Sequence, residues 1–160
     1  MQKVVDLLIK QGKKIATMES CTGGGVANAI TNIPGASEVL EFSAVTYSND
    51  AKIMMGIDKD IIDKYSVYSK ETAQSMAKAI CIKANSDYGV GITGKLSRVD
   101  KNNPYGIDNQ VFGCIYDKEK DMYYPFDLYV DKDNREDNKK LVIDKVKEEL
   151  IKIITPIVKK

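Results

Sequence analysis

A short apolar segment that runs into a glycine-rich turn constrains the fold more than any other stretch of the chain. Residues 14–18 (KIATM) have the composition of a buried strand, and residues 26–30 (VANAI) have helical spacing. Between them lie Glu19, Ser20, Cys21, Thr22 and the glycines at 23–25. Glycines let a ligand approach the backbone, and the first turn of a helix offers N–H groups to an anion. The pattern therefore predicts a strand–turn–helix unit that binds a ligand, with a purely structural turn as the alternative.

The absence of histidine narrows the chemistry that this turn can support. Ser-His-Asp and Cys-His catalysis are excluded, and so are zinc sites built on imidazole. A proton shuttle near neutral pH must then be a lysine, tyrosine, cysteine or a carboxylate with a shifted pKa. The three cysteines are widely spaced and form no C-x-x-C pair, which argues against a disulfide framework and a zinc knuckle.

The bulk composition is that of one globular domain spanning residues 1–160. A formal net charge of +1 gives no general reason to expect binding to nucleic acid or to an anionic membrane. No apolar run approaches the ~20 residues that a membrane-spanning helix needs, and the N-terminus lacks the apolar core of a signal peptide. We therefore expect a cytoplasmic protein whose partner is a small molecule; homo-oligomerisation stays open.

The order of the expected elements predicts the fold class. The expected strands are 14–18, 42–47, 88–93, 111–116 and 122–130, the last two forming a hairpin with Pro125 on an edge strand. The expected helices are 2–11, 26–32, 51–55 after an Asn49 cap, 58–64, 70–85 after Ser69, and a final helix capped by Asn134. Early strand–helix alternation followed by a hairpin predicts an α/β fold, a three-layer α/β/α sandwich on a mixed sheet of about five strands.

A serine, a tyrosine and a lysine are expected to meet at one edge of that sheet. Ser20 follows the first strand, whereas Tyr47 and Lys52 flank the end of the second strand and the start of the next helix. The carboxyl ends of parallel strands lie together, and ligands bind there. Without histidine, a nucleophilic serine needs a base such as a lysine whose ammonium form is destabilised, here by the helix N-terminus.

Other interpretations of these residues stay open. Lys52 can be a solvated surface lysine and Ser20 a turn residue. Cys21 is a rival nucleophile, because a helix N-terminus can lower the pKa of a thiol. At the end of the third strand, Thr93 and Gly94 can add a hydroxyl and backbone donors, and Lys95 and Arg98 can meet a phosphate from the long loop that follows.

Three motifs in the first third of the chain resemble the CinA C-terminal domain family. They are E-S-C-T-G-G at 19–24, I-P-G-A-S at 33–37 and V-T-Y-S-N-D-A-K at 45–52. That family includes nicotinamide-nucleotide amidohydrolases, which deamidate nicotinamide mononucleotide to nicotinate mononucleotide and ammonia. The resemblance implies that Ser20 is the nucleophile and that Tyr47 and Lys52 activate it, with no metal and no organic cofactor.

The residues expected to bind the substrate are Thr22, Gly23, Gly24, Asn49, Thr93 and Gly94. The oxyanion of the reaction is expected on N–H groups around Thr22 and Gly23. Beyond residue 57 the chain departs from the family pattern, above all at 95–106, a loop expected to help hold the nucleotide. A nucleotide-binding homologue without catalysis and a hydrolase of another amide are therefore the alternatives.

Overall fold

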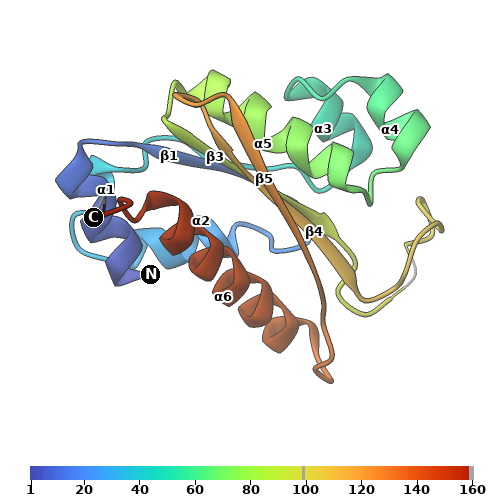
Figure 1. Ribbon diagram of the computed structural model, residues 1–160. Coiled ribbons are helices and arrows are strands. Elements are labelled where there is room, and N and C mark those ends of the chain that lie inside the picture. Colours follow the sequence, from blue (N-terminus) through green and yellow to red (C-terminus); the bar gives the residue numbers. More distant parts are fainter. Residues whose placement is uncertain (99, 159–160) are drawn as a thin grey trace.

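A five-stranded sheet with the order β2-β1-β3-β4-β5 forms the middle of the molecule (Figure 1). The computed structural model describes residues 1–98 and 100–158. The strands are β1 (Ile15–Glu19), β2 (Ala44–Val45), β3 (Tyr88–Gly94), β4 (Gln110–Asp117) and β5 (Met122–Tyr129). Strand β1 runs parallel to β2 and β3, whereas β3, β4 and β5 are antiparallel neighbours. The predicted mixed sheet, with its C-terminal hairpin on the edge, is confirmed.

Helices cover both faces of this sheet, so the predicted α/β/α sandwich is confirmed as well (Figure 1). One face carries α1 (Gln2–Gln11), α2 (Gly25–Thr31) and α6 (Arg135–Ile154). The other carries α3 (Asn49–Met54), α4 (Lys59–Tyr65) and α5 (Lys70–Ala84). A short 3-10 turn, η1 (Ala36–Glu38), lies between α2 and β2. None of the helices in the described part of the chain is both long and apolar enough to cross a membrane.

Each face of the sheet has its own apolar core. The α6 side chains Val142, Val146 and Leu150 are fully buried with residues of α1, α2 and β3. On the opposite face α5 lies very close to β3, because two glycines of that strand leave room for the helix backbone. A Cβ atom on Gly89 would lie 2.0 Å from the carbonyl oxygen of Ala77, and one on Gly91 2.3 Å from that of Ala73.

Two local predictions were wrong. The N-cap of α3 is Ser48, whose Oγ accepts a hydrogen bond from the N–H of Ala51 at 3.1 Å; Asn49 is the first helical residue. The strand predicted at 42–47 is reduced to the two residues of β2, which are the only ones in that stretch that pair with β1 in the register of a strand. The caps predicted at Ser69 and Asn134 are confirmed, and each side chain accepts a backbone N–H three residues on.

The strand order places the functional turns together. Strands β1, β2 and β3 are parallel, so Glu19, Val45 and Gly94 end at the same edge of the sheet. The chain leaves β1 toward β2 on one side and returns to form β3 on the other side. Such a reversal opens a crevice between neighbouring strands, here β1 and β3, where α/β proteins bind ligands.

Candidate active site

Ser20 and Lys52 are in direct contact, although 32 residues separate them along the chain. Ser20 lies just after β1, and Lys52 lies on α3, one turn after the Ser48 cap. The Nζ of Lys52 donates a hydrogen bond to the Oγ of Ser20 at 3.1 Å and another to the carbonyl oxygen of Thr46 at 2.8 Å. These two bonds hold the Nζ at 3.1 Å from the Oγ, which is close enough for the neutral amine to accept the hydroxyl proton as a lysine base must.

Lys52 is buried, with 2% of its surface exposed, in contrast to the solvated lysine of the alternative interpretation. Burial disfavours the ammonium form and lowers the pKa of Lys52 from 10.5 to about 8. Loss of hydration on burial is the main cause of this lowering. About a tenth of the amine is therefore neutral at pH 7, far more than for an ordinary lysine, and this neutral form can accept a proton.

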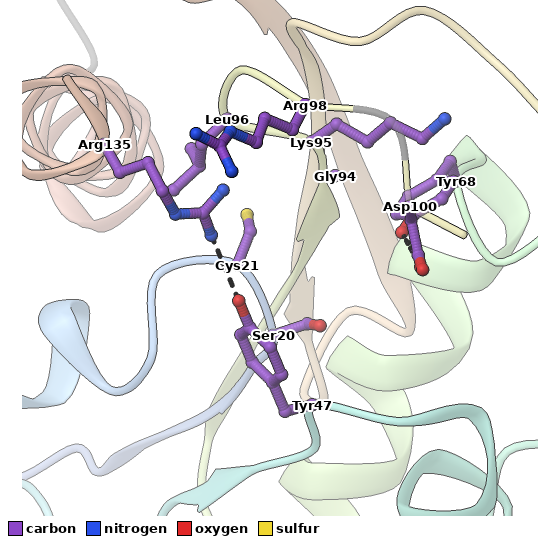
Figure 2. A pocket seen from close by; sticks show the side chains of 10 residues that line it. All are labelled: Ser20, Cys21, Tyr47, Tyr68, Gly94, Lys95, Leu96, Arg98, Asp100 and Arg135. Atoms are coloured by element: carbon purple, nitrogen blue, oxygen red, sulfur yellow. Dashed lines mark hydrogen bonds between the residues drawn. The ribbon is translucent and has the colours of Figure 1, made fainter. Parts of the chain in front are cut away.

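Tyr47 stands beside this pair but makes a different contact. Its side chain is 64% exposed, and its hydroxyl accepts a hydrogen bond from the Nη2 of Arg135 at 3.0 Å (Figure 2). The backbone carbonyl of Thr46, the preceding residue, holds the lysine instead. A role for Tyr47 in activating the serine therefore stays a prediction.

The N-terminus of α2 already has an anion bound to it, from within the chain. The buried carboxylate of Glu19 accepts the N–H groups of Val26 and Ala27 at 2.8 and 3.0 Å. It also accepts the hydroxyls of Thr22 and Thr17 at 2.7 and 2.9 Å. The expectation that these N–H groups are available to bind a ligand was wrong, because both donate to Glu19. The same bonds fix the turn that carries Ser20.

Of the remaining predicted binding residues, Gly94 lines the cleft in front of Ser20. Gly23 and Gly24 take left-handed conformations (φ +62° and +93°) that shape the turn. The Gly23 N–H donates to the carbonyl oxygen of Ser20 at 2.9 Å, so it serves the turn. The hydroxyl groups of Thr22 and Thr93 are engaged as well, with Glu19 and with the carbonyl oxygen of Val67. The Asn49 amide pairs with that of Asn103 at 2.9 Å.

A cleft of about 380 Å³ opens in front of Ser20 (Figure 2). It is lined by Ser20, Cys21, Tyr47, Tyr68, Gly94, Lys95, Leu96, Arg98, Asp100 and Arg135. Three of these are cations and one is a carboxylate, so the cleft favours an anionic ligand. Lys95 and Arg98 were predicted to meet a phosphate, and both line the cleft. Arg135, Tyr68 and Asp100 were missed, because no local motif marks them; Arg135 reaches the cleft only because α6 begins beside it (Figure 2).

Cys21 shares the cleft but is a poor nucleophile. Its thiol is buried, and burial raises its pKa to about 12, the opposite of the lowering expected at a helix N-terminus. The thiolate, which is the reactive form, is therefore scarce at neutral pH. Within residues 1–98 and 100–158 we find no group of three or more cysteine or carboxylate side chains placed to hold a metal ion.

Comparisons with known proteins agree on one family. The model of the CinA C-terminal domain family matches residues 1–153. The chain is 46% identical over 92 residues to a CinA-like protein of Kosmotoga olearia, which covers 57% of this chain and 22% of that protein. It is 35% identical over 125 residues to a CinA-like protein of Endomicrobium trichonymphae, covering 76% of this chain and 28% of that protein.

The chain thus spans about a quarter of the length of the curated relatives that it matches. Among solved structures, a CinA superfamily protein of Klebsiella pneumoniae has the same fold, with a TM-score of 0.87 at 19% identity over 96% of this chain and 94% of that chain. With its motifs at the cleft, its fold and its match over residues 1–153, the chain belongs to the CinA C-terminal domain family.

Proposed function

We propose that this protein is an amidohydrolase that deamidates nicotinamide mononucleotide, with Ser20 as nucleophile and Lys52 as general base. The observation that carries the proposal is the 3.1 Å hydrogen bond between the Lys52 amine and the Ser20 hydroxyl, formed by a buried lysine with a pKa of about 8. A neutral amine in hydrogen-bond contact with a serine can take its proton as the oxygen attacks a carbonyl carbon.

The acylation step uses both groups. Ser20 Oγ attacks the carboxamide carbon and gives its proton to the Lys52 amine, so that a tetrahedral oxyanion forms. The resulting ammonium returns the proton to the carboxamide nitrogen as the C–N bond breaks. Ammonia leaves, and the nicotinoyl group remains as an ester on Ser20. The hydroxyl of Tyr47, which lines the same cleft, is the group that we assign to relaying a proton in this step.

The second step returns the enzyme to its starting state. Water attacks the ester carbon and gives a proton to Lys52, and the Lys52 ammonium passes that proton to Ser20 Oγ as the ester bond breaks and nicotinate mononucleotide leaves. We assign the oxyanion of both steps to the backbone N–H groups of Cys21 and Thr22, which directly follow the nucleophile in the turn. Gly23 is left out of this assignment because its N–H already donates to Ser20.

The charges of the cleft support an anionic substrate such as a mononucleotide. Arg98 and Arg135 present exposed guanidinium groups, which suit bidentate contacts with a phosphate. Lys95 is 3% exposed, and its Nζ makes no hydrogen bond with any described residue, although Asp108 lies 3.6 Å away. The Nζ also stands 5.0 Å from the centre of the Tyr68 ring. A cation with unused donors beside the cleft can bind a ligand oxygen.

The test is ammonia release from nicotinamide mononucleotide by the purified protein and by Ser20→Ala and Cys21→Ala variants. We expect turnover by the wild type and by Cys21→Ala, and loss of activity in Ser20→Ala. Activity that survives in Ser20→Ala and disappears in Cys21→Ala would identify the Cys21 thiol as the nucleophile instead. A folded wild type that binds the nucleotide without releasing ammonia would instead identify a binding homologue without this activity.

A further inference from the structure

The cations that line the cleft point to two different sides of it. Figure 2 shows the guanidinium groups of Arg98 and Arg135 together, on the side where α6 begins. The Lys95 side chain extends the other way, toward Tyr68 and Asp100 (Figure 2). Its Nζ lies 5.0 Å from the centre of the Tyr68 ring. The cleft therefore offers a ligand two surroundings, a pair of guanidinium groups and an ammonium group beside acids.

The ammonium group of Lys95 is buried without a hydrogen bond to any described residue. The nearest carboxylate oxygen, Oδ1 of Asp108, is 3.6 Å away, which is too far for a hydrogen bond. Burying an ammonium is costly unless its N–H groups are bonded, and Lys95 has three of them unused. Since the residue lines the cleft, a ligand oxygen is the acceptor that this side of the cleft lacks.

The acids beside Lys95 decide which kind of oxygen suits it. Asp108, at 3.6 Å, already offsets the positive charge of the ammonium. Asp100 accepts the Tyr68 hydroxyl at 2.5 Å, and this bond holds the pKa of Asp100 below its usual range, so a second negative charge is fixed on this wall. Both carboxylates would repel a phosphate placed here. A hydroxyl group carries no charge, and it can accept a hydrogen bond from Lys95 and donate one to Asp108.

We propose that Lys95 binds the ribose hydroxyl groups of the ligand and that Arg98 and Arg135 bind its phosphate. The identity of the ligand rests on the proposed function. In nicotinamide mononucleotide the ribose joins the ring that carries the carboxamide to the phosphate, so its hydroxyls lie between the two ends of the molecule. Lys95 is then a specificity-determining residue for the sugar, and it belongs to the stretch 95–106, where the chain departs from its family's pattern.

The test is calorimetric binding to Ser20→Ala protein, which keeps the ligand intact, with further substitutions made in that background. Lys95→Met should weaken binding of nicotinamide mononucleotide about tenfold, the size of one charge-assisted hydrogen bond, and leave the affinity for its 2′,3′-dideoxy analogue unchanged. Arg98→Ala should weaken both of these ligands and leave the affinity for nicotinamide riboside, which has no phosphate, unchanged. Lys101→Met is the matched control, because it removes the same charge from an exposed position on the same loop.

Three results would overturn the proposal. If Lys95→Met weakens the nucleotide and its dideoxy analogue equally, Lys95 does not read the hydroxyls. If it weakens neither, Lys95 binds no part of the ligand. Methionine has a similar volume and no charge, so Lys95→Met should be at least as stable in urea as its parent; a marked loss of stability would make Lys95 a structural residue.

Ammonia release by the wild type separates this proposal from the proposed function. Binding that depends on Lys95 and on the hydroxyls, without ammonia release, would contradict the deamidase and support the ribose contact. Ammonia release by a protein whose Lys95→Met variant binds both nucleotides as tightly as its parent would do the reverse.

Discussion

Replacing Lys52 with methionine should change how the stability of the protein depends on pH. Burial lowers the pKa of Lys52 from 10.5 to about 8, which corresponds to about 3 kcal/mol of free energy. Between these two pH values the unfolded chain holds a proton on Lys52 that the folded protein does not. The free energy of unfolding of the wild type must therefore rise with pH through that window. Below pH 8 both states hold the proton, so the cost of burying the ammonium is fully present and this dependence on pH is absent.

Methionine fills a similar volume and carries no proton, so the Lys52→Met variant lacks this rise. The free energy of unfolding of both proteins is measured in urea at pH 7 and at pH 10. From pH 7 to pH 10 the wild type should gain about 2–3 kcal/mol more than Lys52→Met. Loss of the hydrogen bond to the Thr46 carbonyl affects both pH values and cancels in the difference. Lys3→Met, at an exposed position on α1, is the control. Parallel pH dependences in wild type and Lys52→Met would refute a buried lysine with a lowered pKa.

Three further predictions follow from the same geometry. Glu19→Gln should destabilise the protein by about 2 kcal/mol in urea unfolding, because the carboxylate accepts four donors; an unchanged midpoint would contradict its role at the α2 terminus. Gly89→Ala should cost about 3 kcal/mol, since its Cβ would meet the Ala77 carbonyl; a stable variant would show that α5 can shift. Arg98→Ala should raise KM for nicotinamide mononucleotide about tenfold with little change in kcat, and a purely kcat effect would exclude a binding role.

Local patterns predicted much of the fold. The caps at Ser69 and Asn134 and the edge position of Pro125 were predicted because each depends on neighbours in the sequence. The cap of α3 was assigned to Asn49 because serine and asparagine are nearly equal as N-caps, and only the backbone geometry distinguishes Ser48.

The site was predictable only in part, for a physical reason. Ser20 follows β1, and Lys52 lies on the helix that follows β2; because β1 and β2 are parallel, these two segments start from the same edge of the sheet, so their meeting followed from topology. Arg135 and Asp100 reach the same cleft through the start of a distant helix and through a long loop, and no pattern in the sequence fixes such placements. The role of Glu19 was missed because its carboxylate bonds to N–H groups seven and eight residues further along the chain, and those groups were expected to be available for a ligand.

The most direct test of the central claim is the rate of ammonia release from nicotinamide mononucleotide between pH 6 and pH 9, in the wild type and in Ser20→Ala. If Lys52 is the base for Ser20, the wild-type kcat should rise with pH around a midpoint of about 8, and Ser20→Ala should show no turnover above background. No turnover by well-folded wild type, or equal turnover by both proteins, would contradict the account.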